Sequence, residues 1–189
     1  MANNWSTCSS CGKKWTSLYN VVQYVVDNYD DTLNLGAKLY PKVGGSFLRG
    51  CDVTNGVEVP ITTTGDGAAV LAGIPGANNS PSGNTPLYGG LNEAFSYFTN
   101  NFTIAGSKAV ILVADGDHNC SGSNQDILNL VTNAYNNDQI STYVVGVDIP
   151  TSGSLFNQLN TLAAAGGTSV LYNSNDNQSL EDAMQTIAD

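Results

Sequence analysis

The 189-residue sequence contains few basic residues and no long apolar run. Six lysines and arginines stand against sixteen acidic residues, which gives a formal net charge of −10. So few scattered bases cannot neutralise a row of phosphates, which argues against nucleic-acid binding and against binding to anionic membrane surfaces. A membrane-spanning helix needs about 20 mostly apolar residues, and no such stretch is present. A cation is the more natural partner for this chain.

Histidine and cysteine are also scarce. We interpret the single histidine, His118, as a surface-loop residue, because no Gly-x-Ser-x-Gly elbow accompanies it to suggest a Ser-His-Asp site. The four cysteines are Cys8, Cys11, Cys51 and Cys120. An even number in an acidic, lysine-poor chain favours an oxidising compartment, extracellular or at the cell surface, with one or two disulfides. A zinc site and reduced cysteines are the alternatives.

Patterns typical of helices and strands alternate along the chain. After a polar leader loop, 1–14, three-to-four-residue apolar spacing predicts helices at 15–29, 67–71, 87–98, 127–135, 155–162 and 180–187. Alternating or continuous apolar runs predict strands at 33–39, 57–61, 109–114, 141–147 and 169–172. Gly-rich and Pro-rich loops precede Cys51 and fill 73–86. This order predicts one α/β domain with a mostly parallel sheet and helices on both faces.

Several segments carry a family resemblance. The runs KAVILVADGD, YVVGV and LNTLAAAGGTSVLY, preceded by GNTPLYGGLNEAF, resemble a von Willebrand factor A domain of the bacterial secreted or surface type. The resemblance extends over about residues 15–189. It implies a Rossmann-like fold with a metal ion-dependent adhesion site at the carboxyl ends of the central strands.

The resemblance assigns two residues to that metal site. Thr85 matches the family's loop threonine, and Asp115 matches the aspartate that follows its fourth strand. Hydroxyl and carboxylate oxygens suit Mg²⁺, Mn²⁺ or Ca²⁺, whose open coordination position would accept an acidic group from a partner protein. The family's Asp-x-Ser-x-Ser loop and first strand are not in this sequence. We therefore expect this chain to bind a divalent cation weakly or not at all.

The missing first strand has structural consequences. By the resemblance, Met1 stands just after the missing motif, so the sequence is either a truncated reading of a longer gene product or a natural fragment. Losing a central strand would leave unpaired backbone groups on its two neighbours. We expect the strands at 33–39 and 109–114 to pair directly, or a strand from elsewhere to fill the gap.

The functional prediction is a non-enzymatic binding or adhesion module. One alternative is a metal-dependent hydrolase that uses Asp115 and Asp117, and another is a subunit of a surface fibre completed by a strand in trans. The predicted fold places all four cysteines at one end of the sheet. Of the three possible pairings we favour Cys8–Cys11 with Cys51–Cys120.

Overall fold

The protein is an α/β fold built on a parallel sheet. The computed structural model describes residues 1–189 except 44–49, 63–64, 66 and 103. Within them the sheet has three strands, β1 (Lys108–Ala114), β2 (Ile140–Val147) and β3 (Leu171–Ser174), in the order β1-β2-β3. Leu112 of β1 lies opposite Val144 of β2, and both strand pairs are parallel. This confirms the predicted fold class.

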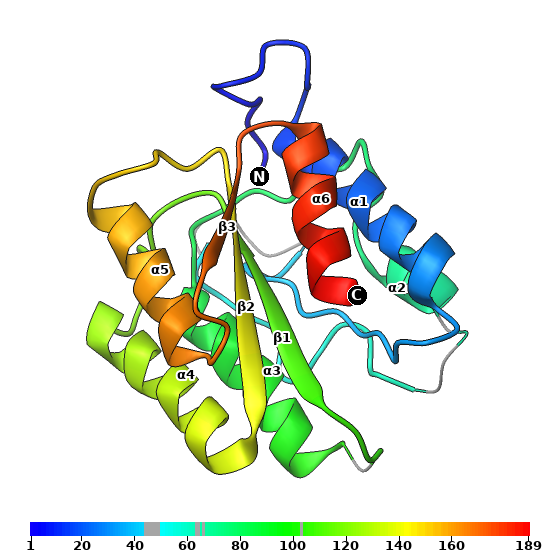
Figure 1. The fold of residues 1–189 in the computed structure, drawn as a ribbon, viewed down its shortest axis with the longest axis vertical. Coiled ribbons are helices and arrows are strands. Elements are labelled where there is room, and N and C mark those ends of the chain that lie inside the picture. The colour runs from blue at the N-terminus through cyan, green and yellow to red at the C-terminus, as the bar shows by residue number, and fades with distance from the viewer. Residues whose placement is uncertain (44–49, 63–64, 66, 103) are drawn as a thin grey trace.

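Helices cover both faces of the sheet (Figure 1). The described residues form α1 (Lys14–Tyr29), α2 (Gly67–Gly73), α3 (Leu87–Asn100), α4 (Asn124–Asp138), α5 (Ser154–Ala165) and α6 (Asn177–Ala188). All six predicted helices are therefore confirmed, most of them a few residues longer than predicted. Capping boxes begin α4 and α6, where Ser123 and Asp176 accept hydrogen bonds from backbone N–H groups of the first turn. None of these helices is long and apolar enough to span a bilayer.

The apolar core lies in two layers, one on each face of the sheet. One layer joins α3, α4 and α5 to side chains such as Leu112 and Val144. The other joins α1 and α6 to Val145 and Val147. Those β2 side chains are fully buried, as the continuous apolar run of β2 predicted.

The two predicted strands at 33–39 and 57–61 are wrong. These segments share only one antiparallel bridge, in which the N–H groups of Ala37 and Val59 each donate to the other residue's carbonyl at 3.0 Å. Side chains take the place of further ladder bonds, because the Leu39 N–H donates to the Glu58 carboxylate at 2.7 Å and the Lys38 ammonium donates to the Thr54 carbonyl. An alternating pattern alone does not make a strand when no neighbouring strand pairs with it.

The expected direct pairing of 33–39 with 109–114 is wrong as well. Among the described residues, β1 has one strand neighbour, β2, and its other edge is unpaired by any strand. The Gly-rich loop expected before Cys51 falls largely on 44–49, outside the described residues.

Candidate functional site

Two aspartates meet at the carboxyl edge of the sheet. Asp115 directly follows β1 and Asp148 directly follows β2, and since these strands are parallel neighbours both carboxylates emerge at the same edge. Lys14, the first residue of α1, points its ammonium between them. Its Nζ lies 3.1 Å from Asp148 Oδ2 and 3.9 Å from Asp115 Oδ2. Lys14 is only 7% exposed, so this cation is a fixed part of the edge.

The predicted metal ligands, Thr85 and Asp115, do not assemble a cation site. The Asp115 carboxylate is engaged by the Met1 amino group as well as lying near Lys14. The Thr85 backbone is bound to the loop that follows β1, through its N–H to the Asn119 side-chain oxygen at 2.7 Å. No group of three or more His, Cys, Asp or Glu side chains that could hold a metal occurs in the part of the chain that the structure describes. The Asp115 carboxylate thus lies near the Lys14 ammonium, and within the described residues no group of three or more such side chains is available to complete a metal site with Asp115 and Thr85.

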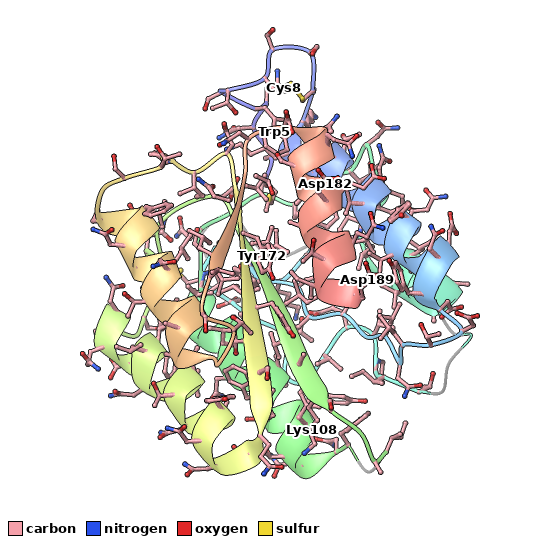
Figure 2. The ribbon with its side chains drawn as sticks, viewed as in Figure 1. Trp5, Cys8, Lys108, Tyr172, Asp182 and Asp189 are labelled. Carbon is pink, nitrogen blue, oxygen red and sulfur yellow. A yellow bond between two sulfur atoms is a disulfide. The ribbon has the colours of Figure 1, made fainter. Side chains whose placement is uncertain are left out.

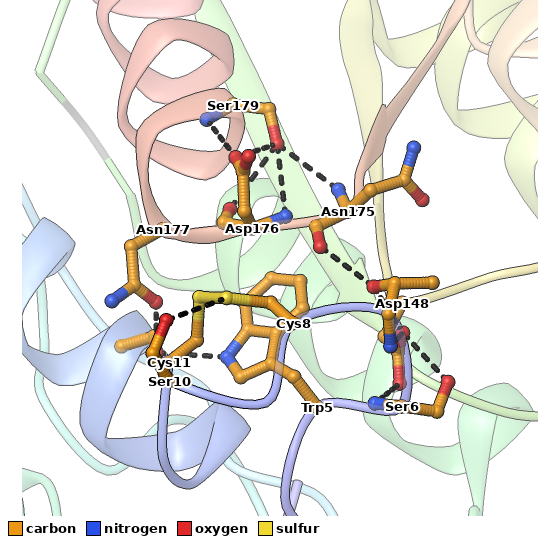
Figure 3. Close-up of a disulfide and its surroundings, with 12 residues drawn as sticks. Trp5, Ser6, Cys8, Ser10, Cys11, Asp148, Asn175, Asp176, Asn177 and Ser179 are labelled. Atoms are coloured by element: carbon orange, nitrogen blue, oxygen red, sulfur yellow. Dashed lines mark hydrogen bonds between the residues drawn. A yellow bond between two sulfur atoms is a disulfide. The ribbon is translucent and has the colours of Figure 1, made fainter.

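Asp148 fastens the leader loop to the sheet (Figure 3). Its carboxylate accepts hydrogen bonds from the N–H and hydroxyl of Ser6, at 2.7 and 2.9 Å, and from the N–H and hydroxyl of Thr7, at 3.1 and 2.7 Å. Burial by itself would raise the pKa of Asp148. The bonds from Ser6 and Thr7 and the nearby Lys14 ammonium outweigh that effect and hold the pKa well below its ordinary value. Asp148 is therefore a charged anchor under the leader.

The leader is further fixed by Trp5, which the sequence left unassigned. Its ring is buried against Val21 of α1 and Leu180 of α6, and its indole N–H donates to the Ser17 hydroxyl at 2.9 Å. Figure 2 shows Trp5 and Cys8 beside the start of α6, at the opposite end of the sheet from Lys108. The leader is therefore a packed cover over the carboxyl edge.

Both predicted disulfides are present, Cys8–Cys11 within the leader and Cys51–Cys120 between two loops. All four cysteines are thus paired, so the zinc and reduced-cysteine alternatives are wrong.

The loop after β1 is held by side-chain contacts around His118. Its Nδ1 lies 3.1 Å from the Thr85 carbonyl oxygen and its Nε2 lies 2.5 Å from the Gly122 carbonyl oxygen. His118 thus connects two loops of the carboxyl edge, a role that goes beyond the predicted surface position.

The hydrolase alternative needs Asp115 and Asp117 to act as a pair. Asp115 faces the ammonium groups of Lys14 and Met1, whereas Asp117 is exposed to solvent. The described residues therefore do not assemble a two-carboxylate metal site.

The sequence carried a signal for Asp148, which follows a buried strand as Asp115 does, but none that would have placed Lys14, Ser6 and Thr7 around it.

The comparisons with known proteins agree with this architecture. No curated protein matches the chain. A family model, described as the von Willebrand factor type A domain, matches residues 8–186. That match spans nearly the whole α/β body and the Cys8–Cys11 leader, and the chain therefore belongs to the von Willebrand factor type A domain family.

Proposed function

We propose that the chain is a non-enzymatic binding module that makes protein contacts outside the cell or at its surface, as an adhesion domain does. Its family supports the general class, because these domains are typically interaction modules. Two disulfides support an oxidising location. The partner is a protein or another surface ligand, and in a family site that holds a cation the partner would present an acidic group to that cation.

The observation that carries this proposal is the construction of the carboxyl edge. Open α/β sheets bind their ligands at this edge. Here the leader is bound to Asp148, and the loop after β1 is bound to Thr85 through Asn119 and to a second loop through Cys51–Cys120. The tips of these loops are polar and exposed. A surface fixed before binding loses little conformational freedom on association, which favours a contact role.

A divalent cation is not required for the contacts that this chain makes. Asp115 and Asp148 already share the Lys14 ammonium, so a cation of the protein itself lies between these two carboxylates. In this chain we place the partner contact on the exposed loop tips around Asp117. A version of the site that also held a cation would in addition bind an acidic group of the partner.

The test is a selection of displayed random peptides on the immobilised chain, with binding measured in Mg²⁺ and in EDTA. We expect the selected peptides to lose at least tenfold in affinity on Asp117→Arg, and to keep their affinity on Asp138→Arg. Asp138 is the matched control because it ends α4, next to the start of β2 and thus at the opposite edge. Peptides that bind both variants equally would refute a binding surface at the carboxyl edge.

A further inference from the structure

The turn at Asn55 and Gly56 contains the only Asn-Gly pair in the sequence. Asn55 is exposed, and within the described residues its side chain has no hydrogen-bond partner. Gly56 has a φ of +71°, and a Cβ placed on it would meet no described atom within 4 Å, its chain neighbours aside. The Asn55 side chain is thus free to turn, and no side chain on the next residue hinders its approach to the Gly56 nitrogen.

A carboxylate holds the N–H group of Gly56. This N–H donates to Glu93 Oε2 at 2.5 Å, and Glu93 lies in the middle of α3. On the other side of the turn, the Thr54 carbonyl accepts a hydrogen bond at 2.7 Å from the Lys38 ammonium. Asn55 therefore stands between two fixed peptide groups. A base within hydrogen-bond reach of a proton is placed to remove that proton.

The charge of Glu93 makes it suitable as this base. Within the part of the chain that the structure describes, Glu93 forms no ion pair, whereas Glu58 on the same loop pairs with Lys38 at 3.3 Å. A carboxylate without a cation beside it keeps its full negative charge for the group it contacts. The Gly56 N–H is therefore polarised by Glu93, and it is the nitrogen next to the Asn55 side chain.

We propose that Asn55 is a site of self-modification, at which Glu93 is the general base for loss of the side-chain amide. Glu93 takes the proton of the Gly56 N–H while the Gly56 nitrogen attacks Cγ of Asn55. A bond forms between that nitrogen and Cγ, the bond from Cγ to Nδ2 breaks, and Nδ2 takes the proton from Glu93 and leaves as ammonia. Water then opens the cyclic imide at either carbonyl, which yields aspartate or isoaspartate. The reaction occurs once in each chain, so it does not make the module an enzyme.

The modification changes a segment that is joined to the carboxyl edge of the sheet. It replaces a neutral amide by a carboxylate, and isoaspartate also lengthens the backbone by one carbon. Cys51 of the same segment is bonded to Cys120 in the loop after β1. A slow change of charge is thus built in beside that loop.

The test compares the rate of amide loss at Asn55 in the folded chain with the rate in a synthetic peptide of residues 53–59. The peptide has the same local sequence but cannot place Glu93 at the Gly56 N–H. Mass spectrometry of proteolytic fragments separates asparagine from its acidic products. A positioned general base contributes on the order of a hundredfold or more, and the fixed turn offsets part of that gain. We expect the folded chain to react at least tenfold faster than the peptide.

Two variants assign the effect to Glu93. Glu93→Gln keeps an oxygen that can accept the Gly56 N–H but cannot take its proton, so it should slow amide loss at Asn55 at least tenfold. Glu181→Gln makes the same change on α6, in the other layer of the fold, and should leave the rate unchanged. Thermal unfolding verifies that both variants are folded. Amide loss at the exposed Asn79, which precedes a serine, is the internal reference and should not respond to either variant.

Three results would overturn the proposal. The first is a folded chain that reacts no faster than the peptide, because the turn would then protect Asn55. The others are a Glu93→Gln variant that reacts as fast as wild type, and equal slowing by Glu93→Gln and Glu181→Gln. No partner and no residue of the proposed contact surface takes part in this reaction, so its failure leaves the proposed function standing.

Discussion

The contact between Asp148 and the leader allows a sharp prediction. The Asp148 side chain is 1% exposed, and it accepts four hydrogen bonds from Ser6 and Thr7 while pairing with the buried Lys14 ammonium at 3.1 Å. Asp148→Ala removes the acceptor and leaves a buried cation with only Asp115 nearby, at 3.9 Å. Breaking a buried pair from one side costs roughly 3–5 kcal/mol. For a domain of this size that lowers Tm by on the order of 10 °C.

The assay is urea unfolding followed by circular dichroism, with Asp182→Ala as the control. Asp182 is an exposed acid on α6, and its loss should change the free energy of unfolding by less than about 0.5 kcal/mol. Lys14→Met combined with Asp148→Ala should recover part of the loss, because the unpaired cation is then absent. A loss below about 1 kcal/mol for Asp148→Ala would refute the anchoring role of Asp148.

The same contact predicts a pH dependence. The fold lowers the pKa of Asp148, so its carboxylate adds stability above the ordinary aspartate pKa of about 3.9, and that stability is lost as the pH falls below it. Asp148→Asn resembles the protonated side chain. We therefore expect the difference between wild type and Asp148→Asn to be largest near neutral pH and to shrink below about pH 4. A difference that does not change with pH would contradict this assignment.

Three further predictions concern the leader, the disulfides and the metal. Cys51→Ser removes a disulfide between residues 69 apart and should lower the free energy of unfolding by about 4 kcal/mol. Cys8→Ser, whose partner is three residues away, should lower it by about 2 kcal/mol. Equal losses in urea unfolding would contradict the loop-length argument. Trp5→Ala should lower the free energy of unfolding by roughly 3–5 kcal/mol and make the leader sensitive to trypsin at Lys13. A leader that stays resistant to trypsin would show that Trp5 does not hold it. Adding Mn²⁺ or EDTA should shift Tm by less than about 1 °C, because a ligand raises Tm only by binding the folded state. A saturable rise in Tm with Mn²⁺ would reveal a cation site.

The sequence predicted those elements whose apolar pattern is decided locally. The continuous run in β2 and the three-to-four-residue spacing in α4 place side chains such as Val144 and Val131 in the core, and both are fully buried. The segments at 33–39 and 57–61 have an equally regular pattern. They are not strands, because strand formation also depends on a partner, and the Glu58 side chain takes the Leu39 N–H instead.

The candidate site was harder to predict because its contacts join distant parts of the chain. Asp148 and Ser6 are 142 residues apart in sequence, and nothing in the local pattern at either position indicates the other. Asp115 could be placed at the carboxyl edge, since it ends a buried strand. Its neighbours there, Lys14 and Met1, depend on how α1 packs across the sheet, which periodicity does not reveal.

Amide hydrogen exchange along β1 in the free chain tests the central structural claim most directly. If the outer edge of β1 is open, the amides of Ala109, Ile111 and Val113 exchange much faster than those of Val110 and Leu112, which face β2. Protection of all five amides to the same degree would show that the outer edge of β1 is already paired, and would contradict the three-stranded sheet described above.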